Sequence, residues 1–86
     1  MYETINEKID VVAVFGRKFK EARPFKIKWQ GREYTIKKIG YRHQVKEGRI
    51  IYHVFSVTDG TNFFELKYDS ANLSWILGRI SDNEAN

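Results

Sequence analysis

The sequence predicts an all-β protein, a single antiparallel meander of about six strands that is strongly bent or curled into a half-open barrel. Three observations carry this prediction. Apolar and polar residues alternate along short segments, turn signals separate these segments at roughly ten-residue intervals, and three of the turns are of types that join neighbouring antiparallel strands. The expected strands are residues 8–15, 24–30, 32–43, 49–58, 61–68 and 74–80.

The pair Asp59-Gly60 is the strongest turn signal, because Asp-Gly between two apolar runs favours a two-residue hairpin loop. Such a loop pairs Phe55 with Phe64. One face of the two strands then carries mostly apolar and aromatic side chains, which is typical of a face that packs on a core.

The segment Lys46-Glu47-Gly48 predicts a three-residue loop with glycine at its left-handed third position. This loop extends the same core face to the preceding strand and places Tyr41 on it. A two-residue loop at Glu47-Gly48 is the alternative, and it would turn Tyr41 away from Phe55.

The pair Gln30-Gly31 predicts the third hairpin, in which Phe25, Ile27 and Trp29 point into the core. The apolar faces of the second and third hairpins join only if the chain gains one residue between them. We therefore expect a β-bulge at Lys37-Lys38, which would bend the sheet sharply.

The lysines of this hairpin alternate with its core residues, as the two-residue period of a strand requires. Lys28 lies directly opposite Glu33 in the predicted register, which gives a cross-strand charge pair. Lys26 keeps no charged partner. The alternation of lysines with aromatic residues therefore reflects mostly the two-residue period of the hairpin and not a binding surface.

The two ends of the chain are less regular. Apolar residues occupy both faces of 8–15, which predicts a strand that is central or buried on both faces. The segment 74–80 has some helical spacing, but Gly78 in its interior and the exposed Trp75 of such a helix favour a strand. We expect one domain over 1–86 with an ordered core at about 8–80 and a frayed tail at 81–86.

Composition excludes several classes of site. The chain has no cysteine, so it has no disulfide, thiolate nucleophile or Cys-ligated metal. No apolar run approaches the roughly 18 residues that a membrane span needs, and the first ten residues are acidic and polar, unlike a signal peptide. We expect a cytoplasmic protein without membrane contact.

The residues that could do chemistry are few. In the predicted register His43 and His53 share one face of adjacent strands, but no carboxylate is placed beside them to complete a metal site. No Ser, His and acid are spaced as a triad, and no glycine-rich phosphate loop occurs. We expect no enzymatic activity and no catalytic residue, cofactor or metal.

The charge of the chain is uneven. Residues 17–49 hold twelve Lys or Arg against three acids, whereas the rest holds three against eight. Such asymmetry favours a surface for nucleic acid or another polyanion, with an acidic protein as a further partner class. The plain alternative is that solvated strands and turns are filled with lysine. The candidate polyanion-binding residues are Arg17, Lys18, Lys20, Arg23, Lys26, Lys37, Lys38 and Arg42.

A second hypothesis rests on an apolar patch on the face opposite the core, at Tyr52, Val54 and Phe63. The chain's own ends, a second subunit or a ligand would cover such a patch. The alternative function is therefore a protein-interaction or homodimeric structural module.

Four short motifs carry a resemblance: the apolar run VVAVF, the entry RPFKIKW, the turn WQGREY and the segment LSWIL. On these motifs, Asp10 to Ile80 resembles a family of small bacterial all-β proteins of unknown function. The resemblance implies an all-β meander and a final strand at 74–80. It implies no activity and no functional residue.

Overall fold

The computed structural model describes residues 2–16 and 22–82, which form seven strands and no helix. All paired strands are antiparallel, in the order β3-β2-β1-β7-β6-β5-β4. The predicted all-β fold class is confirmed. The strands are β1 (Tyr2–Phe15), β2 (Ala22–Trp29), β3 (Arg32–Thr35), β4 (Lys38–Glu47), β5 (Ile50–Thr58), β6 (Asn62–Asp69) and β7 (Ser74–Asp82).

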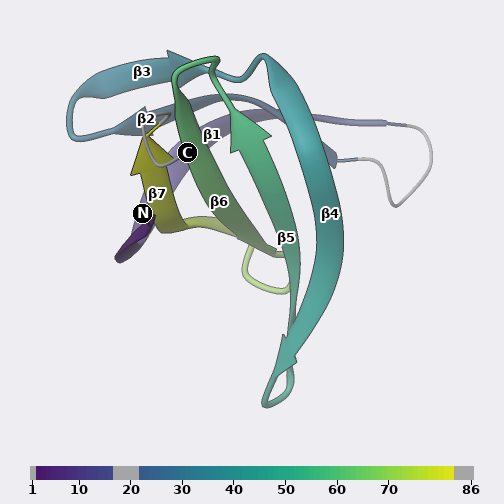
Figure 1. The fold of residues 1–86 in the computed structure, drawn as a ribbon. Coiled ribbons are helices and arrows are strands. Elements are labelled where there is room, and N and C mark those ends of the chain that lie inside the picture. The colour runs from purple at the N-terminus through teal and green to yellow at the C-terminus, as the bar shows by residue number, and fades with distance from the viewer. Residues whose placement is uncertain (1, 17–21, 83–86) are drawn as a thin grey trace.

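The sheet is a meander whose first and last strands also pair. Every two strands that follow each other along the chain are neighbours, except β3 and β4, which form the two edges. At the other side β1 runs beside β7, with Tyr2 paired to Ser81. The sheet is therefore bent like a barrel that stays open between β3 and β4, as the ribbon shows (Figure 1).

The opening begins at the link between β3 and β4. The backbone N–H of Ile36 donates to the carbonyl of Phe25 in β2, and the N–H of Lys37 donates to the carbonyl of Thr58 in β5, both at 2.8 Å. The chain thus changes its pairing partner within one residue. The single strand expected at 32–43 is therefore two strands, and the bulge expected at Lys37-Lys38 is replaced by this break.

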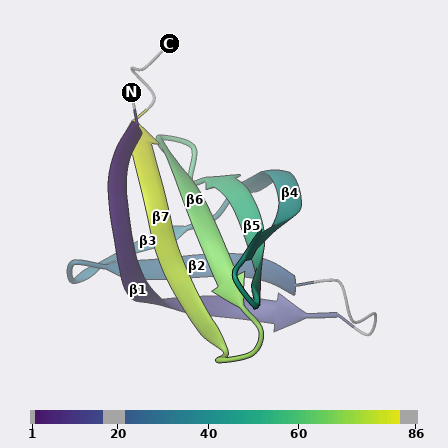
Figure 2. The ribbon, with the colours of Figure 1, turned by 90° about the horizontal axis from the view of Figure 1, so that it is seen from below.

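Strand β1 is bent and serves both halves of the sheet. Its first half pairs with β7 and its second half, Asp10 to Phe15, pairs with β2 (Figure 2). The strand begins six residues before the predicted 8–15. Of the two predicted alternatives, a central strand or a strand buried on both faces, the first is confirmed, since β1 lies between β2 and β7. It is not buried on both faces, because Val12 and Val14 are exposed.

Irregular positions follow one line across the sheet from β4 to β1. Gly40 is the extra residue in β4, Gly78 is the extra residue in β7, and Asn6 lies in the irregular stretch of β1 with a φ of 53°. Bulges increase local twist and bend the strands that carry them. Three bulges in register therefore bend the whole sheet along this line.

Gly78 is held at this line by a close contact. A Cβ there would lie 3.0 Å from Oε1 of Glu65 and 3.5 Å from its carbonyl oxygen. The space that a side chain would need is occupied by Glu65, so Gly78 lets a charged side chain lie flat across β7.

The core lies on the inner face of the sheet, the face that carries Phe55. Trp75 is its centre, with ring centroids 4.7 Å from Tyr68 and 5.6 Å from Phe55. Ile27 of β2 is fully buried and attaches the β2–β3 hairpin to this core. The buried core residues are Ile27, Phe55, Val57, Phe64, Leu66, Tyr68, Trp75 and Leu77.

The hairpin at Gln30-Gly31 has the predicted register, in which Ile27 pairs with Tyr34 and Trp29 with Arg32. Both turn residues have positive φ, at 53° and 74°. Such a pair of left-handed residues is the geometry of a tight two-residue hairpin loop.

The register predicted at Asp59-Gly60 is wrong by two residues, because Phe55 pairs with Leu66 and not with Phe64. The carboxylate of Asp59 accepts hydrogen bonds from the N–H groups of Thr61 and Asn62, at 2.8 and 2.6 Å. This side-chain turn lengthens the loop. A shift by two leaves every side chain on its predicted face, so the core face of these strands is as expected.

The loop predicted at Lys46-Glu47-Gly48 is also wrong, and here the face changes. Glu47 pairs with Ile50, so the loop consists of Gly48 and Arg49, and Gly48 has a φ of 63°. The register differs from the prediction by an odd number of residues. Tyr41 consequently leaves the core and is 62% exposed.

The segment after β6 is a turn, and β7 is a strand, as predicted for 74–80. Trp75 is buried in the core, which a helix at this place would not have allowed. Ser81 and Asp82 continue β7 in place of the expected fraying, and the rest of the predicted tail, 83–86, lies outside the described residues.

Asp69 fixes the turn between β6 and β7. Its side chain accepts hydrogen bonds from the amide side chain of Asn72 at 2.7 Å and from the N–H groups of Ala71 and Asn72 at 2.9 and 3.3 Å. These bonds, with a smaller contribution from the charge of Lys8, lower the pKa of Asp69 below its ordinary 3.8, although burial acts in the opposite sense.

We expect this carboxylate to make stability dependent on pH in the acid range. The unfolded chain binds the proton at a higher pH than the folded chain, so Asp69 stabilises the fold above about pH 4 and loses this effect as the pH falls through its lowered pKa. Urea unfolding from about pH 6 to pH 2 measures the loss. An Asp69→Asn variant should be less stable at neutral pH and should lose less stability on acidification. Parallel pH profiles for the two proteins would contradict this role.

Candidate functional site

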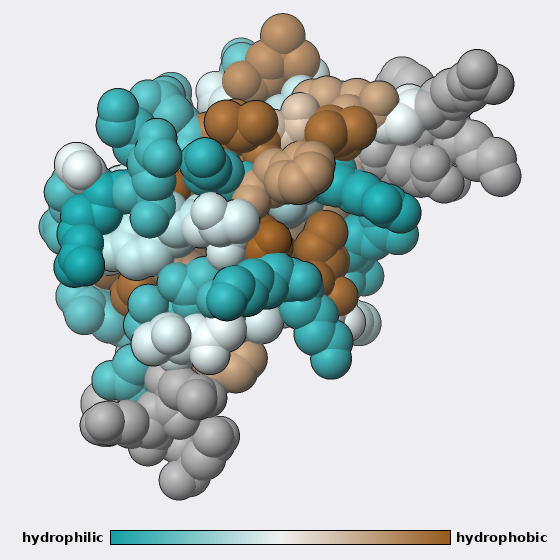
Figure 3. Space-filling model, turned by 90° about the horizontal axis from the view of Figure 1, so that it is seen from above, coloured by the Kyte–Doolittle hydropathy of each residue, from teal (hydrophilic) through white to brown (hydrophobic). Residues whose placement is uncertain are grey.

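The open side of the sheet holds a groove of about 410 Å³, which we call the basic groove. It lies where β2, the link between β3 and β4, and the start of β4 meet. Viewed from above, hydrophobic residues break the surface in the middle of the molecule, with long hydrophilic side chains around them (Figure 3). The groove is lined by Arg23, Pro24, Phe25, Ile36, Lys37, Lys38, Ile39 and Arg42.

Phe25 is the exposed aromatic residue of the groove. The pairing of β1 with β2 shifts by one residue here, since Val12 pairs with Lys26 but Ala13 pairs with Pro24, so Phe25 is the extra residue of a bulge. Its side chain is 54% exposed. The prediction that Phe25 points into the core beside Ile27 is therefore wrong.

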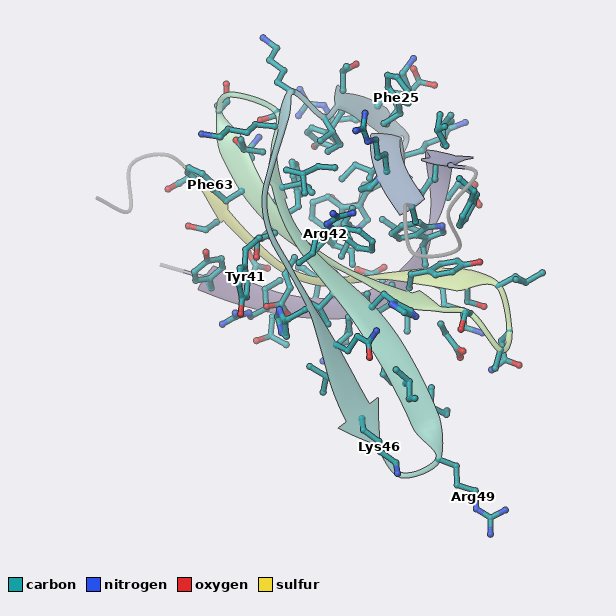
Figure 4. All side chains as sticks on the ribbon, turned by 90° about the vertical axis from the view of Figure 1, so that its right-hand side faces the viewer. Phe25, Tyr41, Arg42, Lys46, Arg49 and Phe63 are labelled. Carbon is teal, nitrogen blue, oxygen red and sulfur yellow. The ribbon has the colours of Figure 1, made fainter. Side chains whose placement is uncertain are left out.

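Arg42 reaches the groove from β4. It pairs with Phe55 of β5 and so lies on the inner side of the sheet, beyond the buried core. Tyr41, the residue before it, points to the opposite side of β4 (Figure 4). The register that removed Tyr41 from the core is the one that brings Arg42 into the groove.

Lys37 and Lys38 stand at the corner where the chain enters β4. Lys38 pairs with Thr58, and the stem of Lys37 lies over Gly60, where a Cβ would be 3.5 Å from the lysine Cδ. Gly60 has a φ of 99°, a conformation that glycine accepts without strain. The turn between β5 and β6 thereby leaves room for Lys37 at the groove.

The groove is electrostatically one-sided. Four of its eight lining residues are cationic and none is acidic. Within the described chain, no carboxylate forms an ion pair with Arg23, Lys37, Lys38 or Arg42. Their charges reinforce one another across a concave surface, which is the arrangement that attracts an anionic ligand.

The structure thus brings together four of the eight candidate polyanion-binding residues. Lys26 lies apart from the groove, with its Nζ 3.7 Å from Oε1 of Glu33. The charge partner predicted for Glu33 was Lys28, and the diagonal neighbour Lys26 takes its place. Arg17, Lys18 and Lys20 lie outside the described residues.

The predicted apolar patch does not form one surface. Val54 is buried, and the ring of Tyr52 is half-buried beneath Lys67, whose Nζ lies 5.1 Å from the ring centroid. Lys67 also pairs with Glu47 at 3.2 Å. Of the three residues, only Phe63 is exposed, at 40%.

Phe63 belongs instead to a second hollow, of about 280 Å³, which we call the outer pocket. It lies across β4 from the basic groove and follows the line of irregular positions. Tyr2, Tyr41 and Phe63 are its exposed aromatic residues. The lining residues are Tyr2, Lys38, Gly40, Tyr41, Ser56, Val57, Thr58, Phe63, Phe64, Glu65 and Arg79.

Two of the residues that line the outer pocket form an ion pair. Nη2 and Nε of Arg79 donate to Oε2 of Glu65 at 2.7 and 3.2 Å, and the guanidinium lies 4.5 Å from the ring centroid of Tyr2. The hydrogen bond with Glu65 and its charge raise the pKa of Arg79. The cation is thus matched by an anion within the pocket.

The histidines are not placed as the sequence suggested. His43 pairs with Val54 and stacks near Tyr41 with centroids 5.0 Å apart, whereas His53 lies on the inner face with its centroid 6.5 Å from that of Tyr68. They point to opposite sides of the sheet. Within 2–16 and 22–82 no cluster of three metal-ligating side chains occurs.

Sequence reasoning missed Phe25, Tyr41 and Tyr2 as surface aromatic residues. One signal was present for Phe25, because it follows Pro24, and proline inside a paired strand is found mainly at edges and bulges. For Tyr41 the signal was the alternative two-residue loop at Glu47-Gly48, which would have turned it away from the core. The observed two-residue loop at Gly48-Arg49 has the same effect on its face.

Comparisons of the chain with models of protein families, with curated proteins and with solved structures find no match. The resemblance to a bacterial family gains no support from them. In the part of the chain that the structure describes, no helix has the length and apolar character that crossing a membrane requires.

Proposed function

We propose that this protein is a non-catalytic binding module for single-stranded nucleic acid, with the basic groove as its binding surface. One observation carries the proposal: an exposed aromatic side chain, Phe25, lines an open groove together with four cations that form no ion pair with any described carboxylate. Proteins bind single strands by stacking bases on aromatic side chains while Lys and Arg hold the phosphates.

The shape of the site favours a single strand over a duplex. Reading a B-form duplex in its major groove requires a protruding helix or a two-stranded ribbon. The basic groove is a recess on the open side of a bent sheet, and its aromatic residue, Phe25, forms part of the lining. Only unstacked bases offer a free face to Phe25.

The alternative of a homodimeric module at Tyr52, Val54 and Phe63 receives no such support. Two of these three residues are buried or covered by Lys67. We therefore propose no second function at that patch.

Binding of a fluorescein-labelled, mixed-sequence single-stranded oligonucleotide, followed by anisotropy, tests the proposal. If the four cations contact phosphates, log K should fall with log salt with a slope of about −3, since each contact contributes about −0.7 on single strands. A duplex of the same sequence should bind more weakly. Absence of binding to either oligonucleotide at low salt would refute the proposed function.

A further inference from the structure

The basic groove and the outer pocket lie back to back across one strand. Lys38 and Ile39 line the groove and Lys38 and Gly40 line the pocket, so a single residue, Lys38, belongs to both. Between Ile39 of the groove and Tyr41 of the pocket, β4 carries Gly40, which has no side chain.

The strand between the two hollows is an edge of the sheet. β4 has β5 on one side and no paired strand on the other in the described chain. A flexible ligand can therefore pass over β4 from one hollow to the other without displacing any paired strand.

The two hollows differ in charge. The outer pocket has one cation with a carboxylate partner, Arg79 with Glu65, and its exposed large hydrophobic residues are all aromatic. Tyr41 is 62%, Tyr2 54% and Phe63 40% exposed. Such a pocket suits an uncharged planar group, whereas Lys38 at its rim has no acidic partner among the described residues and suits a phosphate.

We propose that the outer pocket is a second subsite for the same single strand, in which a nucleobase stacks on Tyr41 and Phe63. This inference rests on the proposed function. The strand places one base on Phe25 in the basic groove, crosses β4 with a phosphate on Lys38, and places a later base in the outer pocket. The affinity should therefore depend on the length of the ligand, because only a strand that crosses β4 can stack bases both on Phe25 and in the outer pocket.

Oligothymidylates of two and of ten nucleotides, each titrated by anisotropy against the wild-type protein, test the subsite. The longer strand should bind at least about fivefold more tightly, since stacking of one base contributes about 1–3 kcal/mol, which corresponds to roughly 5- to 150-fold. A Tyr41→Ala variant should lose most of this advantage and should bind the dinucleotide as the wild type does.

Two further variants separate stacking from structure. Tyr41→Phe keeps an aromatic face and should retain the affinity for the longer strand. Tyr52→Ala removes an aromatic side chain from the same face of the sheet but outside the pocket, and should leave binding of both strands unchanged.

The outcomes distinguish the two proposals. If the wild type binds neither strand, the proposed function fails and the subsite fails with it. If it binds the longer strand and Tyr41→Ala lowers neither affinity, the basic groove stands and the subsite is refuted. A loss for Tyr41→Phe equal to that for Tyr41→Ala would also refute stacking.

Discussion

Replacing Arg23 and Arg42 together by glutamate is expected to lower the affinity for single-stranded oligonucleotides at least about 100-fold at low salt. Hydrogen bonds to charged groups contribute about 1.5–3 kcal/mol each, so loss of two such contacts accounts for this factor before repulsion is included. The slope of log K against log salt should become shallower by about 1.4. Anisotropy titrations at several salt concentrations measure both quantities.

The matched control replaces Lys46 and Arg49 by glutamate. Both residues lie at the tip of the β4–β5 hairpin, far from Phe25 (Figure 4), and the change in net charge is the same. This variant should keep most of the wild-type affinity. If the two double variants lose affinity equally, binding depends on the total charge of the protein and not on the basic groove.

Replacing Ile27 by alanine is expected to destabilise the fold by about 2–5 kcal/mol, because Ile27 is fully buried and its truncation leaves a cavity in the core. A domain of this size has a total stability of about 5–15 kcal/mol, so the variant should unfold at a much lower urea concentration. The loss should be large because Ile27 is the largest fully buried side chain of the β2–β3 hairpin among those described.

Phe25 is the control for this change, since the sequence placed both residues in the core. With its side chain 54% exposed, Phe25→Ala should cost less than about 1 kcal/mol of stability while lowering the affinity for a single strand about tenfold. Destabilisation by Phe25→Ala as large as that by Ile27→Ala would contradict the bulge at this position.

Local chemistry made the strands and one hairpin predictable. The Gln30-Gly31 turn has the register that its sequence dictates, because both residues accept positive φ and the loop leaves no alternative pairing. The strand at 74–80 was predictable because Gly78 and Trp75 opposed a helix. Alternation with a period of two sets the face of each residue as long as the register is right.

The prediction of register failed where a side-chain contact or a neighbouring strand determines the length of the loop. The carboxylate of Asp59 accepts hydrogen bonds within its own turn, and the loop is two residues longer than predicted. A shift by two residues keeps each side chain on its predicted face of the sheet. At Gly48-Arg49 an odd shift reversed the face of Tyr41. Bulges at Gly40 and Gly78 depend on contacts across the sheet, such as that of Gly78 with Glu65, which are invisible in the local sequence.

The candidate site was also predictable only in part: its charge could be read from the sequence, but the placement of its residues could not. The basic segment 17–42 was visible from charge alone, but charge did not tell Lys26 from Arg42. That distinction follows from the ion pair that Lys26 makes with its diagonal neighbour Glu33, and from the register of β4, which turns Arg42 to the inner side. The aromatic partner in the groove was hidden, because Phe25 fits the core pattern until the bulge displaces it.

The pairing of β1 with β7 joins the two most distant parts of the described chain. Joining Tyr2 to Ser81 closes a loop of almost the whole described chain, so this seam carries the greatest loss of chain entropy in the fold, and the hairpin at Gln30-Gly31 carries one of the smallest. The gap lies between β3 and β4, which the chain already joins through Ile36 and Lys37. The edges of β3 and β4 stay unpaired, yet the short link through Ile36 and Lys37 keeps them close together. The groove therefore opens at a place where the covalent chain itself limits how far the two edges can separate.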